Sequence, residues 1–180
     1  MVNLAMDLPT LHTARLLLRP FTRDDIPALM PLIGSREVAA TTRRIPHPYT
    51  LADAESFIET SQQSDVINLA IVRQEDTCFL GGGILRPDHD HQHAELGYWI
   101  GVPYWGKGYA TEAARALLQY GFEVLQLHRI YASHGRNNPV SGKVLQKIGM
   151  KHEGRMREHL VKWGEYLDLE FYGVLRPEAR

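Results

Sequence analysis

The chain has 180 residues, of which 44% are hydrophobic and 23% are charged. This composition is typical of a globular protein with a sizeable core, and it excludes the disordered and fibrous classes. The 20 lysines and arginines nearly balance the 21 acidic residues, whereas a marked basic excess would be expected of a nucleic-acid-binding surface. We therefore expect one domain spanning residues 1–180 and no nucleic-acid partner.

The cysteine content and the N-terminal sequence allow a prediction of the protein's cellular location. Cys78 is the only cysteine, so an internal disulfide is excluded, and its apolar neighbours Phe79 and Leu80 predict a small buried side chain. The segment from Met1 to Asp7 has no basic start, and no stretch of the chain reaches the roughly 18 apolar residues of a membrane span. These features predict a soluble cytoplasmic protein without a membrane partner, acting as a monomer or a homodimer.

The N-terminal part predicts a strand followed by a short helix. Residues 16–19 form a short apolar run, and Thr22 then lies three residues before Asp25, which is the spacing of a capping box. Pro27 and Pro31 fall within the helix that follows. Because proline removes a helical hydrogen bond, we expect this helix to be short or kinked.

The middle of the chain changes from helical to extended patterning. Thr50 and Asp53 mark a second helix start, and Ala54, Phe57 and Ile58 then fall on one apolar helical face. After residue 65 three apolar runs follow one another, which indicates an antiparallel meander. These runs cover residues 67–72, 79–85 and 94–100.

The third run and the helix after it show the clearest periodicity. Alternation along the run divides it into Ala94, Leu96, Tyr98 and Ile100 on one face and Glu95, Gly97 and Trp99 on the other. A helix is expected from about residue 107 to about residue 125, with a stripe of small and aliphatic residues that permits close packing on a sheet. The stripe consists of Ala110, Ala114, Leu117, Leu118, Gly121 and Leu125.

The last third predicts a strand, a helix and one or two closing strands. Residues 130–133 form the strand, and Asn138 followed by Pro139 is a strong helix start, because Asn caps well and Pro suits the first helical position. Gly149 would end that helix in a left-handed conformation, and residues 165–175 alternate as strands do. The order of elements predicts a mixed α/β layered domain.

The strongest chemical pattern lies at the start of the long helix. The strand 96–102 runs through Pro103-Tyr104-Trp105 into Gly106-Lys107-Gly108 and then directly into the helix. A helix start exposes unpaired N–H groups and the positive end of the dipole, and glycines let a phosphate approach the backbone. The pattern predicts an anion-binding loop, with a glycine-bearing turn that binds nothing as the alternative at this point.

Two other phosphate-binding motifs do not match. A dinucleotide fingerprint needs a third glycine where Thr111 stands and an acidic residue about 20 positions later, and residues 126–128 offer none. A nucleotide-triphosphate loop needs a longer spacing between its glycines, followed by Lys-Ser or Lys-Thr. Both of these nucleotide classes are therefore excluded.

Together with its flanking elements, this segment resembles the GNAT superfamily of N-acetyltransferases. Their cofactor loop reads Gln/Arg-x-x-Gly-x-Gly/Ala, matched here by Trp105-x-x-Gly108-x-Ala110 with a departure at Trp105. The run Tyr-Trp-Gly-Lys-Gly-Tyr-Ala-Thr-Glu-Ala is similar to the version in the Rim-type branch, which contains the ribosomal-protein N-terminal acetyltransferases. Further segments that look like that branch are 13–19, 138–141, 147–150 and 172–175.

The resemblance implies a fold, a cosubstrate and an acceptor. The fold would be a mixed, mostly antiparallel sheet of about seven strands flanked by about four helices. The cosubstrate would be acetyl-CoA, and the acceptor would be the N-terminal α-amine of a protein such as a ribosomal protein. By the same resemblance, the pyrophosphate would be held by backbone groups of Lys107, Gly108, Ala110 and Thr111. The strand near Ile100 and Val102 would hold the pantetheine arm and polarise the thioester. Asn138 and Ser141 would contact the cofactor.

Amide formation also needs proton transfers. The amine must arrive uncharged, and Glu95 is the best candidate for the general base, with a solvated carboxylate as the alternative. The departing thiolate gains from a proton donor, which many relatives supply as a Tyr in the last helix, where this chain has Leu145. Ser141 either donates that proton or only binds the cofactor, and we favour binding.

A group of histidines and aspartates invites a zinc interpretation. His89, His91 and His93 alternate with Asp88 and Asp90 in a polar turn between two predicted strands. No separate ligand set with the spacing of a structural site accompanies them. We therefore predict no metal site.

Two other functions stay open. A catalytically silent acetyl-CoA-binding module would carry the same loop, and turnover of acetyl-CoA would distinguish it from an enzyme. A small-molecule acetyltransferase acting on a polyamine or an aminoglycoside would differ in its acceptor cleft. We expect loops at residues 43–49 and 155–163 to set the acceptor, and they carry no transferable sequence code.

Overall fold

A mixed β-sheet forms the centre of the computed structural model, which describes residues 8–61 and 65–178. In these residues eight strands lie in the order β1-β2-β3-β4-β5-β6-β8-β7, and all neighbours are antiparallel except β5 and β6. The strands are β1 (Leu11–His12), β2 (Leu16–Pro20), β3 (Ile67–Arg73), β4 (Phe79–Asp88), β5 (His93–Ile100), β6 (Arg129–Gly135), β7 (Lys151–Lys162) and β8 (Glu165–Leu175). The predicted meander is confirmed as β3, β4 and β5.

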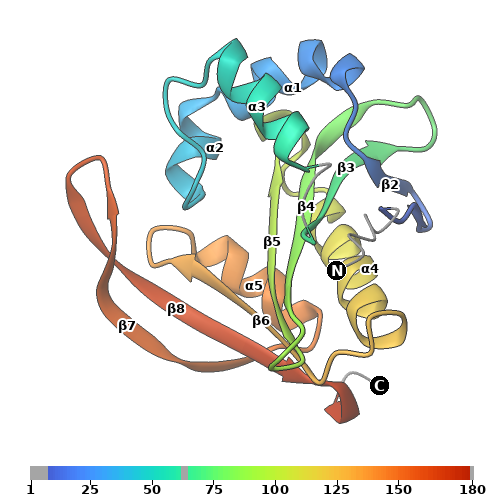
Figure 1. Cartoon of the computed structure of the whole chain (residues 1–180). Coiled ribbons are helices and arrows are strands. Elements are labelled where there is room, and N and C mark those ends of the chain that lie inside the picture. Colours follow the sequence, from blue (N-terminus) through green and yellow to red (C-terminus); the bar gives the residue numbers. More distant parts are fainter. Residues whose placement is uncertain (1–7, 62–64, 179–180) are drawn as a thin grey trace.

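The described residues also form five α-helices (Figure 1). These are α1 (Ile26–Ile33), α2 (Arg36–Thr41), α3 (Leu51–Ser61), α4 (Tyr109–Glu123) and α5 (Pro139–Lys147). In Figure 1, α1, α2 and α3 gather at one end of the molecule, and β7 and β8 form a long hairpin at one edge of the sheet. None of the described helices is both long and apolar enough to cross a membrane.

The predicted mixed α/β class is confirmed, and the described residues hold more elements than we expected. Helix α2 has only six residues, and its start is capped by the Ser35 hydroxyl, which accepts from the N–H of Val38 at 3.2 Å. Strand β7 is exposed at most positions and rich in charge, so it has no apolar period to detect. The prediction of a loop at residues 155–163 is wrong, because residues 155–162 belong to this strand.

Alternate strand residues face two apolar layers. In β3, Leu69 and Ile71 pack in the layer that contains residues of α4 and α5, whereas Ala70 and Val72 pack against α1 and α3. The predicted alternation of residues 94–100 follows the same division, with Trp99 directed to the second layer. Both faces of the sheet are therefore covered near β3, as expected of a layered domain.

Close packing of α4 on the sheet depends on small residues. A methyl group at Gly121 would lie 2.6 Å from Cδ1 of Ile130, and one at Gly83 would lie 2.7 Å from Cδ1 of Leu117. Neither distance is compatible with a normal carbon contact. The prediction that this helix packs tightly through small residues is confirmed.

Local signals placed the first helices correctly. The carboxylate of Asp25 accepts from the N–H of Thr22 at 2.8 Å, and α1 has only eight residues with Pro31 inside it. Ahead of α3, the N–H and hydroxyl of Thr50 both donate to the Asp53 carboxylate. The capping boxes and the short first helix are confirmed.

The burial predicted for Cys78 can be compared with the structure, whereas the prediction for the N-terminal segment cannot. Cys78 is only half-buried, and its Sγ lies 3.1 Å from the hydroxyl oxygen of Tyr104, so full burial is not observed. The segment from Met1 to Asp7, on which the absence of a targeting sequence was predicted, lies outside the described residues.

Candidate cofactor and acceptor site

The sheet opens between β5 and β6. Their parallel ladder covers three residue pairs, from His93 with Arg129 to Glu95 with Tyr131, whereas β5 continues to Ile100 in a ladder with β4 on its other side. Beyond Glu95, the β5 edge that faces β6 therefore forms no further ladder in the described sheet. A free strand edge of this kind can pair with an extended ligand through its amides.

The chain leaves this edge through a tight turn. Strand β5 ends at Ile100, and residues Val102–Tyr104 form a 3-10 turn, so the prediction that the strand reaches Val102 is wrong. Pro103 has no N–H and cannot continue a strand ladder, which accounts for the early end. The indole N–H of Trp105 donates to the Ile100 carbonyl at 2.6 Å and so folds the loop back onto the strand end.

Two glycines shape the loop that enters α4. Gly106 and Gly108 have φ angles of +76° and +82°, a left-handed region that residues with a Cβ rarely adopt. Gly108 is the N-cap of α4, and no side chain caps that start. The first N–H groups of the helix, from Tyr109 to Thr111, are thus available to an anion at the positive end of a 15-residue helix.

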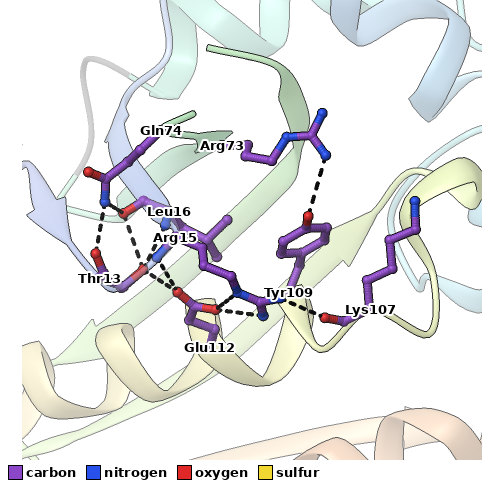
Figure 2. A network of polar contacts seen from close by, with 8 residues as sticks. All are labelled: Thr13, Arg15, Leu16, Arg73, Gln74, Lys107, Tyr109 and Glu112. Carbon is purple, nitrogen blue, oxygen red and sulfur yellow. Dashed lines mark hydrogen bonds and ion pairs between the residues drawn. The ribbon is translucent and has the colours of Figure 1, made fainter. Parts of the chain in front are cut away.

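Arg15, which directly precedes β2, contacts the glycine loop at the start of α4 (Figure 2). Its guanidinium pairs with the Glu112 carboxylate at 2.7 Å, donates to the Lys107 carbonyl at 3.1 Å and lies 4.6 Å from the Tyr109 ring centre. Thr13 also donates its hydroxyl to Glu112 at 2.7 Å. One carboxylate in the first turn of α4 therefore holds the chain that precedes β2.

These contacts also determine the charge of Glu112. Burial alone would raise its pKa, but hydrogen bonds from Thr13 and Arg15 outweigh burial and lower the pKa below its ordinary value. The sequence argument gave no role to Arg15 or Glu112, because they stand 97 positions apart and only the fold joins them.

Helix α5 reaches the same opening from the other side. The Asn138 side chain accepts from the N–H of Ser141 at 3.3 Å, so the predicted cap is confirmed. The Ser141 hydroxyl lies 2.9 Å from the hydroxyl of Tyr98 on β5. Burial raises the pKa of Tyr98 to about 12, which keeps this hydroxyl protonated at neutral pH.

Leu145, which the resemblance sets at the position of the usual Tyr, has a buried side chain. The chain thus places a Tyr hydroxyl near α5 from a different element, since Tyr98 belongs to β5. Alternation along β5 puts Tyr98 and Glu95 on opposite faces. Glu95 and Ser141 therefore approach the opening from opposite faces of β5 rather than forming one pair.

Three arginines surround Glu95. Its carboxylate oxygens lie 2.5 Å from Arg43, 3.6 Å from Arg44 and 3.7 Å from Arg86, and its side chain is only 14% exposed. Arg43 also donates to the Ser133 hydroxyl at 3.1 Å, so one guanidinium spans from β5 to β6. The alternative of a freely solvated carboxylate does not hold.

The loop at residues 43–49 contributes two of these arginines. It contains no helix or strand, as predicted, and the Lys162 ammonium at the end of β7 donates to its Ile45 carbonyl at 2.8 Å. Beside Arg43 and Ser133 lies a small cavity of about 30 Å³, which is room for one water molecule. The surroundings of Glu95 are thus assembled from segments far apart in the sequence.

The histidine turn brings three potential ligands together at the far end of β5. Donor atoms of Asp88, His91 and His93 lie within 4.8 Å of one another, without His89 or Asp90. Among the described residues, the Nδ1 atom of His93 is buried without a hydrogen-bond partner. A metal on Nε2 would place the proton on that unpartnered nitrogen, which is unfavourable. The absence of a metal site stays a prediction.

Comparison with known proteins identifies the family. The model of the acetyltransferase (GNAT) domain matches residues 15–151. An uncharacterised N-acetyltransferase, YnaD of Bacillus subtilis (strain 168), is 31% identical over 92% of this chain and 96% of its own length. The crystal structure of an acetyltransferase (GNAT family) from Bacillus anthracis superimposes with a TM-score of 0.86 at 28% identity, covering 94% of this chain and all of that one.

Two relatives carry names that specify an acceptor, and the names differ. A protein provisionally named as the ribosomal N-acetyltransferase YdaF of B. subtilis (strain 168) is 38% identical over 51% of this chain and 50% of its own length. The spermidine N(1)-acetyltransferase of Escherichia coli (strain K12) is 27% identical over 88% of this chain and 84% of its own. Similarity to named relatives therefore identifies the reaction as acetyl transfer. It does not identify the acceptor, which has to be inferred from the site.

Proposed function

The chain belongs to the GNAT family of acetyltransferase domains, and we propose that it transfers the acetyl group of acetyl-CoA to the N-terminal α-amine of a protein, such as a ribosomal protein. The observation that carries the reaction is the glycine loop at the uncapped start of α4, directly beyond the free edge of β5. We further propose that residues 1–180 act as a single domain in the cytoplasm, without a metal.

The cosubstrate's pyrophosphate would lie against the backbone of Lys107, Gly108, Ala110 and Thr111. The loop is held in place before binding by Arg15, which contacts the Lys107 carbonyl directly. Its pantetheine amides would pair with the free edge of β5 near Ile100, and Val102 would line the turn beyond. Asn138 and Ser141 would contact it from α5. A prearranged loop of this kind lowers the entropic cost of binding.

Chemistry would take place in the opening between β5 and β6. When the amine attacks the thioester carbon, negative charge develops on the carbonyl oxygen, and a fixed backbone N–H on the β5 edge would stabilise it. Glu95 would take a proton from the amine, directly or through a water molecule. The departing thiolate would lie near the Ser141 and Tyr98 hydroxyls, and we favour cofactor binding as the main role of Ser141.

The α-amine acceptor is supported by its chemistry and by the charges on the acceptor face. An α-amine has a pKa near 7.7 to 8.0, whereas that of lysine is about 10.4, so far more of an α-amine is uncharged at neutral pH. A weak base such as the Glu95 carboxylate then suffices. The arginines around Glu95 would repel a polycation such as spermidine.

Cosubstrate binding can be tested by thermal denaturation. A ligand at 100 times its dissociation constant stabilises the folded state by about 2.7 kcal/mol. We expect acetyl-CoA to raise the Tm of the full chain accordingly. An unchanged Tm at millimolar acetyl-CoA would refute cosubstrate binding.

The acceptor can be tested with a panel of amines at equal concentration. Short peptides with free N-termini should be acetylated faster than spermidine or an aminoglycoside, and peptides with blocked N-termini should not react. Faster turnover of spermidine or of the aminoglycoside would favour a small-molecule acetyltransferase. Binding of acetyl-CoA without turnover of any amine would instead favour a silent binding module.

A further inference from the structure

The cluster around Glu95 contains more positive than negative charge. Arg43, Arg44 and Arg86 share this one carboxylate, and no other carboxylate in the described part of the chain pairs with any of them. The formal surplus is two positive charges. The Arg44 side chain is 58% exposed, so water screens part of this surplus. Arg43 and Arg86 are half-buried and share a single carboxylate, and a partly desolvated guanidinium without an anionic partner of its own is costly.

Two of the guanidiniums are held in place rather than free in solvent. The side chains of Arg43 and Arg86 are 29% and 30% exposed, and Arg43 is fixed further by Ser133. Arg86 lies beside Gly97 of β5, where an added methyl group would be 3.9 Å from its Nη1. Burial, followed by the positive charge of Arg44, lowers the pKa of Arg86, as expected where cations crowd together.

Neighbouring elements bring further cations to this side of the opening. Arg36 and Lys162 lie 5.3 Å and 5.4 Å from the Trp163 ring centre at the tip of the β7–β8 hairpin, and Lys162 also holds the loop that carries Arg43. The facing carboxylates of β8, Asp168 and Glu170, are already paired with other cations. Together with the surplus charge of the cluster, these cations favour an anionic ligand on this side of the opening.

The cluster lies where an acceptor would enter. Glu95 marks the last pair of the β5–β6 ladder, so the arginines stand at the vertex of the opening. They occupy the face of β5 that carries Glu95 and Gly97, opposite to the face on which Tyr98 contacts α5. The small cavity lined by Arg43 and Ser133 adjoins them.

We propose that Arg43, Arg44 and Arg86 form an anion subsite that binds a carboxylate on the acceptor, a few bonds away from the amine that is acetylated. The inference rests on the proposed acetyl transfer and narrows its substrate class to amines that carry an acidic group. That group can come from an acidic side chain near a protein N-terminus or from the free carboxylate of an amino acid. Guanidinium groups bind carboxylates through paired, charge-assisted hydrogen bonds.

Matched acceptors test the subsite directly. Two tetrapeptides that differ only in Glu or Gln at the second position, together with free glutamate and its α-amide, should be compared by kcat/KM with acetyl-CoA. We expect the Glu peptide to exceed the Gln peptide by about tenfold or more, the size of effect that a charged hydrogen bond supplies. Preference for free glutamate over both peptides would instead assign the subsite to an amino-acid carboxylate.

Variants show whether the arginines cause the preference. Arg43→Gln and Arg86→Gln should each reduce the Glu-over-Gln ratio to below about threefold, mainly through KM, while the Tm shift caused by CoA stays unchanged. Arg23→Gln is the control, because Arg23 forms an exposed pair with Glu59 away from the cluster, and it should keep the full ratio. Equal rates for all four acceptors, or a ratio unchanged in both cluster variants, would overturn the subsite while leaving acetyl transfer intact.

A binding measurement separates the subsite from the proposed reaction. Titration of the N-acetylated Glu and Gln peptides onto the CoA-bound protein requires no turnover. If no amine is acetylated but the acetylated Glu peptide binds the unaltered chain more tightly than Arg43→Gln, the proposed reaction fails and the subsite stands. If the two acetylated peptides bind equally, the subsite fails.

Discussion

The proposed cofactor loop and the proposed acceptor face lie at the two ends of residues 95–100 of β5, and they differ in the groups that form them. The loop is mostly backbone, with two glycines at positive φ and the free N–H groups of α4. The acceptor face is made of side chains from the loop after α2, from β4, from β5 and from β6. Local sequence sets the geometry of a backbone site, whereas a side-chain site depends on which distant segments the fold brings together.

The largest expected effect is on the cofactor loop. Gly108→Val places a branched side chain at φ +82°, where it is strained and would block a phosphate from the backbone. We expect acetyl-CoA affinity to fall by about 100-fold or more in a direct titration. Gly164→Val is the matched control, because Gly164 has a φ of +84° in the β7–β8 turn. Equal loss of affinity in both variants would mean that strain alone, and not the loop, is responsible.

A substitution on the acceptor face should act on the rate instead. If Glu95 is the general base, Glu95→Gln lowers kcat by about 100-fold or more and alters the acidic limb of the pH profile. Affinity for acetyl-CoA should hardly change. A changed KM for the acceptor with kcat preserved would show that Glu95 only positions the arginines around it. Glu59→Gln, in an exposed surface pair, serves as the control.

Ser141 contacts Tyr98 of β5, which stands in the chain between Glu95 and the glycine loop. Ser141→Ala removes one hydrogen bond, so acetyl-CoA affinity should fall by up to about tenfold with a smaller effect on the chemical step. Tyr98→Phe removes the partner hydroxyl, 2.9 Å away, and should show the same pattern. A fall in single-turnover rate with cofactor affinity unchanged would make these hydroxyls the proton donor for the thiolate.

The smallest expected effect concerns the support of the loop. The pKa of Glu112 is lowered by its hydrogen bonds from Thr13 and Arg15 against the effect of burial, so its stabilising contribution is present above its ordinary value of 4.5 and is lost as the pH falls further. Glu112→Gln should lower the Tm at pH 7 by about 2–4 °C, which corresponds to about 1 kcal/mol at this length. At pH 3 the two proteins should melt closer together. A difference that grows on acidification would contradict the ionised pair.

Much of the fold could be predicted because its signals are local. The helix caps at Thr50 and Asn138, the meander and the packing stripe of α4 each depend on residues a few positions apart. Strand β7 could not be found in this way, because its side chains are exposed on both faces and burial imposes no alternation on them. Helix α2 is too short for its period to be recognised.

At the site, residues close together in the sequence were enough to predict an anion-binding loop, since two glycines before a helix start favour this backbone geometry without help from elsewhere. The sequence also identified Glu95, Asn138 and Ser141 as candidate site residues, but it did not predict the side chains that contact them. The convergence of Arg43, Arg44 and Arg86 on Glu95 and the contact of Tyr98 with Ser141 became visible in the fold alone. The reason is physical: charge and hydrogen bonding act over a few ångströms in space, and the chain folds residues from remote segments into that range.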